Sequence, residues 1–419
     1  MAPSTNEKSK LWVFLRILTN ILWTISLVII LASCSSGKDS PSNSLDSGSV
    51  LGTSYMSGLS VSPGGTLIIH GHDGSSSTPA TGPVSVAVEP HGKFVYVANS
   101  FSNNISAYTI DGTKGDLNLV TASPFTAGTN PSSITVDPTG KFTYVANSYS
   151  SNVSAYTIDT TTGALTEVTG SPFTAGSKPQ FITVDPTGKF VYVTNLNSSN
   201  VSAYTIDSTT GAITEVAGSP FAAQNYPYSV AVDPTGKFAY VVNLGNSNVS
   251  AYTIDASTGA LTPVAGSPFA AGSGSRSVAV NPTGKFVYVA NSYSSNVSAY
   301  TINTTTGALT EVTGSPFAAG FGSQSIAVNP SGKFAYVANY DSNNVSAYTI
   351  DSTKGALKEV AGSPFAAGAN PYAVIVDPTG KFVYVTNNGT NNVSAYTIDV
   401  STGALTPVAG SPFATSTSP

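Results

Sequence analysis

Short runs of β-branched and aromatic residues, separated by turn residues, fill most of this chain. Residues 129–176 contain four such runs: Ser133–Val136, Phe142–Asn147, Val153–Ile158 and Leu165–Val168. Each run has the length and composition of a β-strand, and the segments between them lack helical periodicity. The pattern predicts four short antiparallel strands, named A to D in chain order, joined by hairpin-sized loops.

The four-strand pattern recurs at a constant spacing of 48 residues, as the Gly-Lys-Phe of each copy shows at Gly92, Gly140, Gly188, Gly236, Gly284, Gly332 and Gly380. A fixed repeat of this length is typical of propellers and solenoids. A small sheet that is apolar on both faces cannot stand alone, whereas blades in a ring cover one another. The sequence therefore predicts an all-β fold, a seven-bladed β-propeller of four-stranded antiparallel blades over residues 81–416. A linear β-solenoid is the alternative, although its coils are usually shorter.

Proline and aspartate positions refine this blade. Pro172 has no N–H for a strand ladder, so strand D is expected at the outer edge of the blade. Asp137-Pro-Thr-Gly140 has the residue order of a type I turn between strands A and B, and an Asp at its first position accepts bonds from the turn's own amides. Asn281 and Asn329 replace this Asp in two copies, so the position is interpreted as structural.

The motifs of the copies resemble a known family. Tyr192-Val-Thr-Asn195 and Tyr384-Val-Thr-Asn387, within a longer Asp-Pro-Thr-Gly-Lys-Phe-Val-Tyr-Val pattern, are similar to the Tyr-Val-Thr-Asn repeat of the seven-bladed lactonase-like β-propellers. That family takes its name from a bacterial 6-phosphogluconolactonase. The resemblance covers residues 81–416 and implies the propeller fold. It lies in scaffold residues that propellers of many functions share, so no catalytic residue is carried over.

The N-terminal region predicts export and lipid attachment. Residues 1–33 carry positive charges before a short apolar run, and Leu31-Ala-Ser-Cys34 resembles the lipobox of bacterial lipoproteins, with Cys34 as the lipidation site. An uncleaved anchor spanning Leu11–Ala32 is the alternative. Residues 34–58 are expected to form a flexible Ser/Gly-rich tether, and residues 59–80 a short β segment that caps or closes the ring. The predicted location is the bacterial cell envelope, lipid-anchored and outside the cytoplasm.

Composition excludes some classes of partner. Charged residues make up 9% of the chain, which argues against nucleic acid as a ligand, since that would need a basic stripe. His70-Gly-His72-Asp73 could offer two or three metal ligands, but no further cluster completes a site. We therefore expect neither a metal nor a cofactor.

The repeats are poor in residues that hydrolyse lactones. Such chemistry needs a general base or a metal-bound water, together with a group that stabilises the oxyanion. The seven copies contain one histidine, His91, on an A–B turn, and one arginine, Arg276. No serine lies in a nucleophile elbow. The sequence thus gives no catalytic residue and favours a non-enzyme.

Differences between the copies indicate where a single site lies. The A–B and C–D turns hardly vary, whereas the B–C and D–A loops do, and these two loops emerge on the same end of a propeller. We call this end the variable face. The position just before strand A should ring the channel mouth, and it reads Val84, Ser132, Gln180, Tyr228, Arg276, Gln324 and Tyr372. The B–C loops add the further ligand-binding candidates Tyr149, Tyr293, Tyr340 and Asp341.

Tyrosine and arginine are enriched at binding hot spots. The residues therefore favour a lipid-anchored, non-catalytic binding or scaffold module that takes a protein, peptide or glycan on the variable face. One alternative is a lactonase-type hydrolase, similar to 6-phosphogluconolactonase, acting at the channel mouth. It would need a convergent acid–base pair and a closed pocket there. The other alternative is a purely structural surface protein.

Overall fold

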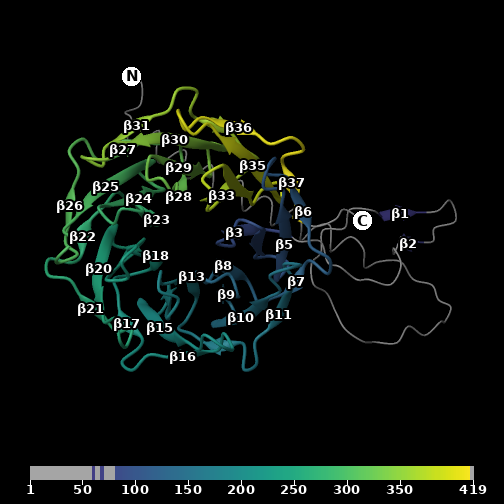
Figure 1. Ribbon diagram of the computed structural model, residues 1–419, viewed down its shortest axis with the longest axis horizontal. Coiled ribbons are helices and arrows are strands. Elements are labelled where there is room, and N and C mark those ends of the chain that lie inside the picture. Colours follow the sequence, from purple (N-terminus) through teal and green to yellow (C-terminus); the bar gives the residue numbers. More distant parts are fainter. Residues whose placement is uncertain (1–58, 62–66, 70–80, 416–419) are drawn as a thin grey trace, which may run out of the picture. The chain divides into compact units, whose positions relative to one another are not determined.

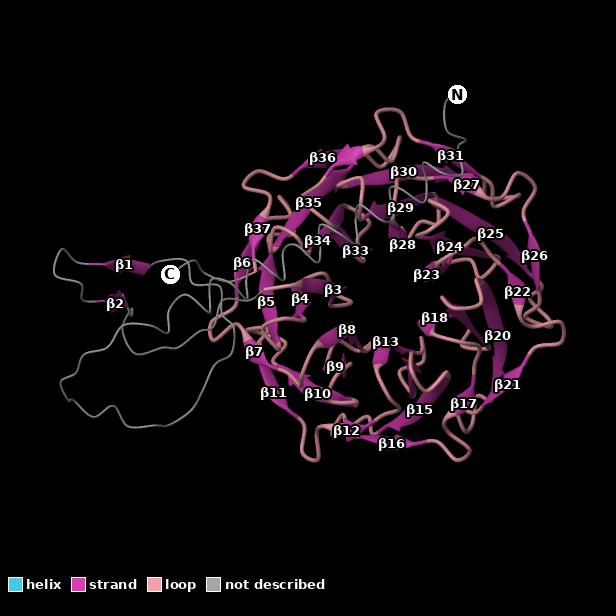
Figure 2. Ribbon diagram, turned by 180° about the vertical axis from the view of Figure 1, so that it is seen from behind, coloured by secondary structure: helices cyan, strands magenta, loops and turns pink. Residues whose placement is uncertain are grey.

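The computed structural model describes residues 59–61, 67–69 and 81–415 of the 419-residue chain. Residues 81–415 form a ring of seven sheets around a central channel, as Figure 1 shows. The described part consists of strands and loops (Figure 2), and it holds no helix long and apolar enough to cross a bilayer. The seven-bladed propeller expected from the repeat is confirmed.

Each blade comes from one copy of the repeat. Strand A lies innermost and is β3 (Pro83–Val88), β8 (Pro131–Val136), β13 (Pro179–Val184), β18 (Pro227–Val232), β23 (Ser275–Val280), β28 (Ser323–Val328) and β33 (Pro371–Val376) in blades 1 to 7. Strand B follows as β4 (Phe94–Asn99), β9 (Phe142–Asn147), β14 (Phe190–Asn195), β19 (Phe238–Asn243), β24 (Phe286–Asn291), β29 (Phe334–Asn339) and β34 (Phe382–Asn387). Strand C is β5 (Asn104–Ile110), β10 (Asn152–Ile158), β15 (Asn200–Ile206), β20 (Asn248–Ile254), β25 (Asn296–Ile302), β30 (Asn344–Ile350) and β35 (Asn392–Ile398).

Strand D forms the outer edge, as Pro172 predicted, but in two segments. The first is β6 (Leu117–Leu119), β11 (Leu165–Glu167), β16 (Ile213–Glu215), β21 (Leu261–Pro263), β26 (Leu309–Glu311), β31 (Leu357–Glu359) and β36 (Leu405–Pro407). The second is β7 (Phe125–Thr126), β12 (Phe173–Thr174), β17 (Phe221–Ala222), β22 (Phe269–Ala270), β27 (Phe317–Ala318), β32 (Phe365–Ala366) and β37 (Phe413–Ala414). In blade 2, β11 pairs with one end of β10 and β12 with the other. A turn through Gly170 and the cis Ser171–Pro172 peptide separates them.

The hydrophobic core lies between neighbouring blades. Phe142, Tyr144 and Ala155 of blade 2 pack against Val191 and Tyr204 of blade 3, and the same arrangement recurs around the ring. Small residues beside aromatic ones let the sheets approach closely. Hydroxyl groups tie the blades further, because Tyr192 of blade 3 donates a hydrogen bond to the Gly259 carbonyl of blade 4 at 3.0 Å.

The ring closes by direct packing of blade 1 on blade 7. Val95 and Val97 of β4 share a core cluster with Tyr384 of β34. The Tyr108 hydroxyl donates to the Ala414 carbonyl at 2.8 Å, which repeats the bond that Tyr156 makes to Thr126 in the next blade pair. The role of residues 59–80 as a cap or closure of the ring stays a prediction. Of that segment the structure describes β1 (Leu59–Val61) and β2 (Leu67–Ile69), which pair antiparallel with each other.

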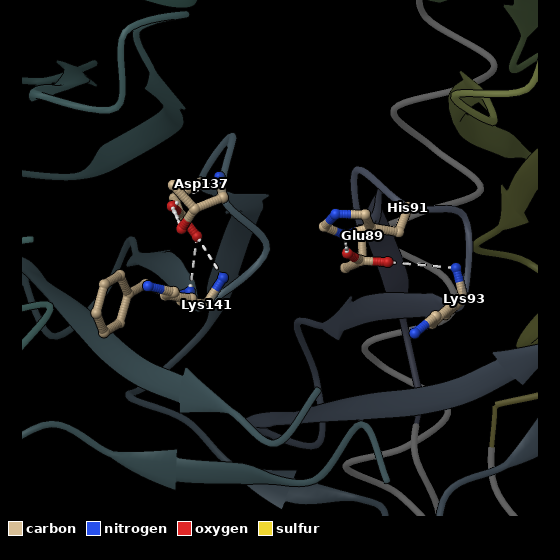
Figure 3. A network of polar contacts seen from close by, with 7 residues as sticks. Glu89, His91, Lys93, Asp137 and Lys141 are labelled. Carbon is tan, nitrogen blue, oxygen red and sulfur yellow. Dashed lines mark hydrogen bonds and ion pairs between the residues drawn. The ribbon is translucent and has the colours of Figure 1, made fainter. Parts of the chain in front are cut away.

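The A–B turns satisfy their own polar groups, as Figure 3 shows for two neighbouring blades. The Asp137 carboxylate accepts hydrogen bonds from the backbone N–H groups of Lys141 at 2.8 Å and Phe142 at 2.7 Å, and from Thr139 at 2.9 Å. In blade 1, the Glu89 carboxylate accepts the backbone N–H of Lys93 at 3.3 Å and also contacts the His91 ring (Figure 3). In blade 5, the amide oxygen of Asn281 accepts the same two backbone bonds from the lysine and phenylalanine that follow, each at 2.9 Å. These carboxylates therefore serve the turn.

Candidate functional site

The second residue of each strand A points into the channel. These seven residues, Val84, Ser132, Gln180, Tyr228, Arg276, Gln324 and Tyr372, all line one small cavity of about 50 Å³ on the channel axis. The expected ring is therefore present, but its members are strand residues rather than loop ends. Tyr228, for example, follows Pro227 within β18. A strand backbone holds these side chains in place more firmly than a loop would.

Four of the seven residues join across the channel in a hydrogen-bonded cluster, which we call the axial cluster. The hydroxyl groups of Tyr228 and Tyr372 lie 2.7 Å apart, although blades 4 and 7 are opposite each other in the ring. Gln324 donates its amide N–H to the Tyr228 hydroxyl at 3.4 Å and accepts a bond from Arg276 Nη1 at 2.9 Å. The axial cluster thus fills the channel between blades 4, 5, 6 and 7.

The Arg276 guanidinium lies between two aromatic rings, 5.3 Å from the Tyr228 ring centre and 5.8 Å from that of Tyr293. Ring faces carry partial negative charge and attract such a cation. Burial by itself lowers the pKa of an arginine, but the facing tyrosines outweigh it and raise the pKa of Arg276, so the group stays cationic. Its Nε–H is buried and finds no hydrogen-bond partner among the residues that the structure describes. This donor is therefore unpaired but also closed off from solvent.

A larger pocket of about 570 Å³ opens above the axial cluster on the variable face. Its lining comes from blades 5, 6 and 7 and comprises Arg276, Ser292, Tyr293, Ser295, Phe321, Gly322, Gln324, Tyr340, Asp341 and Tyr372. Asp341 is exposed and lies on the B–C loop of blade 6. The pocket therefore brings one cation and one carboxylate together, within walls that are otherwise aromatic and hydroxylic.

The pocket lies where blades 5 and 6 depart from the repeat. Their strand A begins at a serine that follows a glycine, Gly274-Ser275 and Gly322-Ser323, whereas strand A of the other blades begins at a proline. Both glycines have positive φ, 73° at Gly274 and 71° at Gly322. A Cβ on Gly322 would lie 2.6 Å from Oδ2 of Asp341. The glycine therefore makes room for the carboxylate beside the pocket.

Most of the predicted residues lie together at this site. Tyr293, Tyr340, Asp341, Gln324, Arg276 and Tyr372 line the pocket, while Tyr228 and Gln180 line the axial cavity beneath it. Tyr149 lines neither, and its side chain is 71% exposed on blade 2. Phe321 was missed, although it stands where the other copies have Thr, Ser, Asn or Ala. Extending the comparison of copies three residues further back from the Gln324 position would have found it.

A hydrolase at the channel mouth was expected to need a convergent acid–base pair and a closed pocket. The pocket at this mouth is lined by one cation, Arg276, and one carboxylate, Asp341. The B–C loop residue Asp341 reaches the mouth only through the packing of blade 6 on blade 5. Within the described ranges, no group of three or more His, Cys, Asp or Glu side chains could hold a metal ion. Cys34 and the His70–Asp73 motif lie outside the described residues.

A family of known proteins matches most of this chain. A protein-family model described as "Lactonase, 7-bladed beta-propeller" matches residues 69–174, 169–226 and 222–417. Comparison with curated proteins gave no match. This family match overturns the expectation of a non-catalytic binding or scaffold module and supports the hydrolase alternative.

Solved structures share the fold. A Bacteroides fragilis protein assigned as a 6-phosphogluconolactonase is 24% identical with a TM-score of 0.64, and the match covers 73% of this chain and 90% of that one. A periplasmic gluconolactonase of Pseudomonas aeruginosa is 21% identical with a TM-score of 0.62, covering 74% and 93%. Kuenenia stuttgartiensis hydrazine synthase is 20% identical with a TM-score of 0.59, covering 80% and 99%. At these identities the likeness concerns the propeller, and several chemistries share it.

Proposed function

Because this chain belongs to the lactonase family of seven-bladed β-propellers, we propose that it hydrolyses lactones in the pocket between blades 5 and 6. The observation that carries the proposal is that Arg276 and Asp341, a cation and a carboxylate from different blades, line the same pocket. Ester hydrolysis needs a donor for the developing oxyanion and a base for water. Among the lining residues these two supply those functions.

Arg276 acts as the oxyanion donor in this proposal. The lactone carbonyl oxygen approaches the guanidinium, which lines the pocket. As water attacks, negative charge grows on that oxygen, and a fixed cation in a partly buried site stabilises it most at that stage. The axial cluster holds the guanidinium in place, because Gln324 accepts its Nη1–H and Tyr228 packs on its face.

Asp341 acts as the general base. Its carboxylate accepts a proton from water while the water oxygen bonds to the carbonyl carbon, giving a tetrahedral oxyanion. Collapse of that intermediate breaks the bond between the carbonyl carbon and the ring oxygen, and the departing alkoxide takes the proton from Asp341. The product is the open hydroxy acid, so lactone plus water equals product and the carboxylate is restored.

The test is turnover by the purified full-length protein, with acid release followed at constant pH. We expect hydrolysis of a simple δ-lactone above the buffer rate, a decrease in kcat of about 10²–10³-fold in Arg276→Gln, and a decrease of about 10²-fold or more in Asp341→Asn. Glutamine is the residue that blades 3 and 6 carry at the Arg276 position, at Gln180 and Gln324. Tyr149→Ala, on the same face but outside the pocket, is the control. Buffer-level rates with the wild type across several lactones, or full activity in both pocket variants, would overturn the proposal.

We also propose that this hydrolase works outside the cytoplasm, held by a lipid on Cys34. The support is the Leu31-Ala-Ser-Cys34 motif directly after a short apolar run. Cys34→Ser should abolish labelling by a fatty-acid analogue in cells and leave the precursor uncleaved. Equal labelling of wild type and variant would show that the motif is not used.

A further inference from the structure

The charge of the pocket carries an inference about its substrate, which rests on the proposed function. We propose that the pocket takes an uncharged, polyhydroxylated lactone, an aldonolactone without phosphate, and that Tyr293 and Phe321 hold its ring by stacking.

The charged side chains of the lining are Arg276 and Asp341, which carry opposite charges. A phosphate carries up to two negative charges and is usually bound by several cations or by converging backbone N–H groups. Here the one lining guanidinium already donates to Gln324 and lies against tyrosine rings. Asp341 would repel a second anion in the same pocket. The site can therefore serve one developing oxyanion but offers no second cation to a phosphate.

Lysines do not supply the missing charge. Most of those in the described residues lie on the A–B turns, at the other end of the channel, as Lys93, Lys141, Lys189, Lys237, Lys285, Lys333 and Lys381. Lys114 and Lys354 lie on C–D turns, and Lys358 lies in β31 at the outer edge. Lys178 is on the variable face, but it precedes β13 in blade 3 and does not line the pocket. The distribution of charge thus favours a neutral substrate.

The pocket mouth presents two aromatic rings to solvent. Tyr293 is 66% exposed and Phe321 is 72% exposed, yet both line the pocket. An aromatic face carries partial negative charge and attracts the polarised C–H groups on the flat side of a sugar ring. Ser292, Ser295 and Gln324 add hydrogen-bonding groups for hydroxyls in the same lining. Stacking surface and neutral polar groups together are the features that recognise an uncharged sugar lactone.

Two substrates that differ only in phosphate test the inference. With the full-length protein at low ionic strength, we expect kcat/KM for D-glucono-1,5-lactone to exceed that for its 6-phosphate by about 10-fold or more, the size of one unfavourable charge contact of about 1.4 kcal/mol. Equal or better hydrolysis of the phosphate would overturn the inference and leave the proposed function intact. Phe321→Ala should raise KM for the neutral lactone several-fold with little change in kcat. Phe101→Ala is the matched control, because Phe101 is 69% exposed on blade 1 and does not line the pocket.

A binding measurement separates this inference from the proposed function. We expect the uncharged gluconolactam, which keeps the ring but resists hydrolysis, to bind the full-length protein in titration calorimetry and to bind several-fold more weakly to Phe321→Ala. If neither lactone is hydrolysed but the lactam binds in this way, the catalytic proposal fails and the substrate class stands. No lactam binding, or equal binding to the two proteins, would refute the substrate class.

Discussion

The two ends of this propeller differ in how far equivalent positions of the seven copies keep the same residue. At the end with the A–B turns, each aspartate accepts the backbone N–H groups of its own turn, and the arrangement recurs at Asp137, Asp185, Asp233 and Asp377. On the variable face, equivalent positions hold different side chains, and Arg276 lines a pocket. Repetition thus stabilises the scaffold, whereas a single site arises where one copy differs from its neighbours.

The invariant end also contains natural substitutions that show what it requires. Asn281 keeps the turn bonds of Asp233 without the charge, and Asn303 does the same for the C–D turn of Asp255. At the Arg276 position, by contrast, no other copy has an arginine or any other cation. Changes at the invariant end should therefore alter stability, and changes at the variable face should alter activity.

The largest expected effect on stability comes from a glycine that lies between blades. A Cβ on Gly259 would lie 2.4 Å from Cδ1 of Phe190, whereas a Cβ on Gly218 would lie 3.7 Å from Cε1 of Phe221. Both glycines have positive φ, 79° and 86°. Gly218→Ala should lower the free energy of unfolding by about 1–2 kcal/mol, because its backbone is strained. Gly259→Ala should lower it by about 3 kcal/mol or more, because overpacking against Phe190 adds to the same strain. Denaturant unfolding of the two variants measures the difference, and equal losses would mean that Phe190 moves aside freely.

A smaller effect is expected at the A–B turn. Asp233→Ala removes the acceptor for the N–H groups of Lys237 and Phe238, both at 2.7 Å, and leaves buried donors unpaired. The expected loss is about 2–3 kcal/mol in the free energy of unfolding. Asp233→Asn should lower the free energy of unfolding by less than about 1 kcal/mol, because Asn281 accepts the equivalent backbone N–H groups in blade 5. If both variants lose the same amount, the charge itself stabilises the turn.

At the variable face we expect activity and stability to separate. Arg276→Gln should change the free energy of unfolding by no more than about 1 kcal/mol. The loss of the bond to Gln324 and of the contacts with the tyrosine rings is offset in part by removal of a buried N–H that lacks a partner in the described structure. The same variant should lose nearly all lactone hydrolysis. Thermal unfolding and turnover on one preparation give both numbers. A large loss of stability would assign Arg276 to the scaffold.

Much of this architecture could be predicted from the sequence, because each blade is local in the chain. The runs of strands A, B and C and the outer place of strand D follow from residues within one repeat. The split of strand D was missed, since Phe173 pairs with Val153 only after a turn that brings it back to the other end of strand C. Comparing copies also found the ring around the axis. The pocket could not be predicted, because Arg276 and Asp341 come to line the same pocket only through the packing of one blade on the next.

The smallest expected effect concerns acid and the C–D turns. Asp255 accepts the Ser257 hydroxyl at 2.5 Å and the backbone N–H groups of Ser257 at 2.9 Å and Thr258 at 3.0 Å, and these bonds lower its pKa to about 2. An unfolded aspartate titrates near pH 4. Because the folded pKa is the lower one, the ionised side chain stabilises the fold above about pH 4, and this contribution is lost as pH falls toward about 2.

Asp255→Asn should remove that dependence, as Asn303 already lacks it in blade 5. The variant should be slightly less stable than the wild type at pH 7, and the two stabilities should converge between about pH 4 and pH 2. The other C–D aspartates titrate equally in both proteins, so the difference between the two melting curves isolates this turn. Thermal unfolding over that pH range measures it. Curves that stay parallel down to pH 2 would mean that the carboxylate charge adds nothing at this end of the ring, and that the turn depends on oxygen geometry alone.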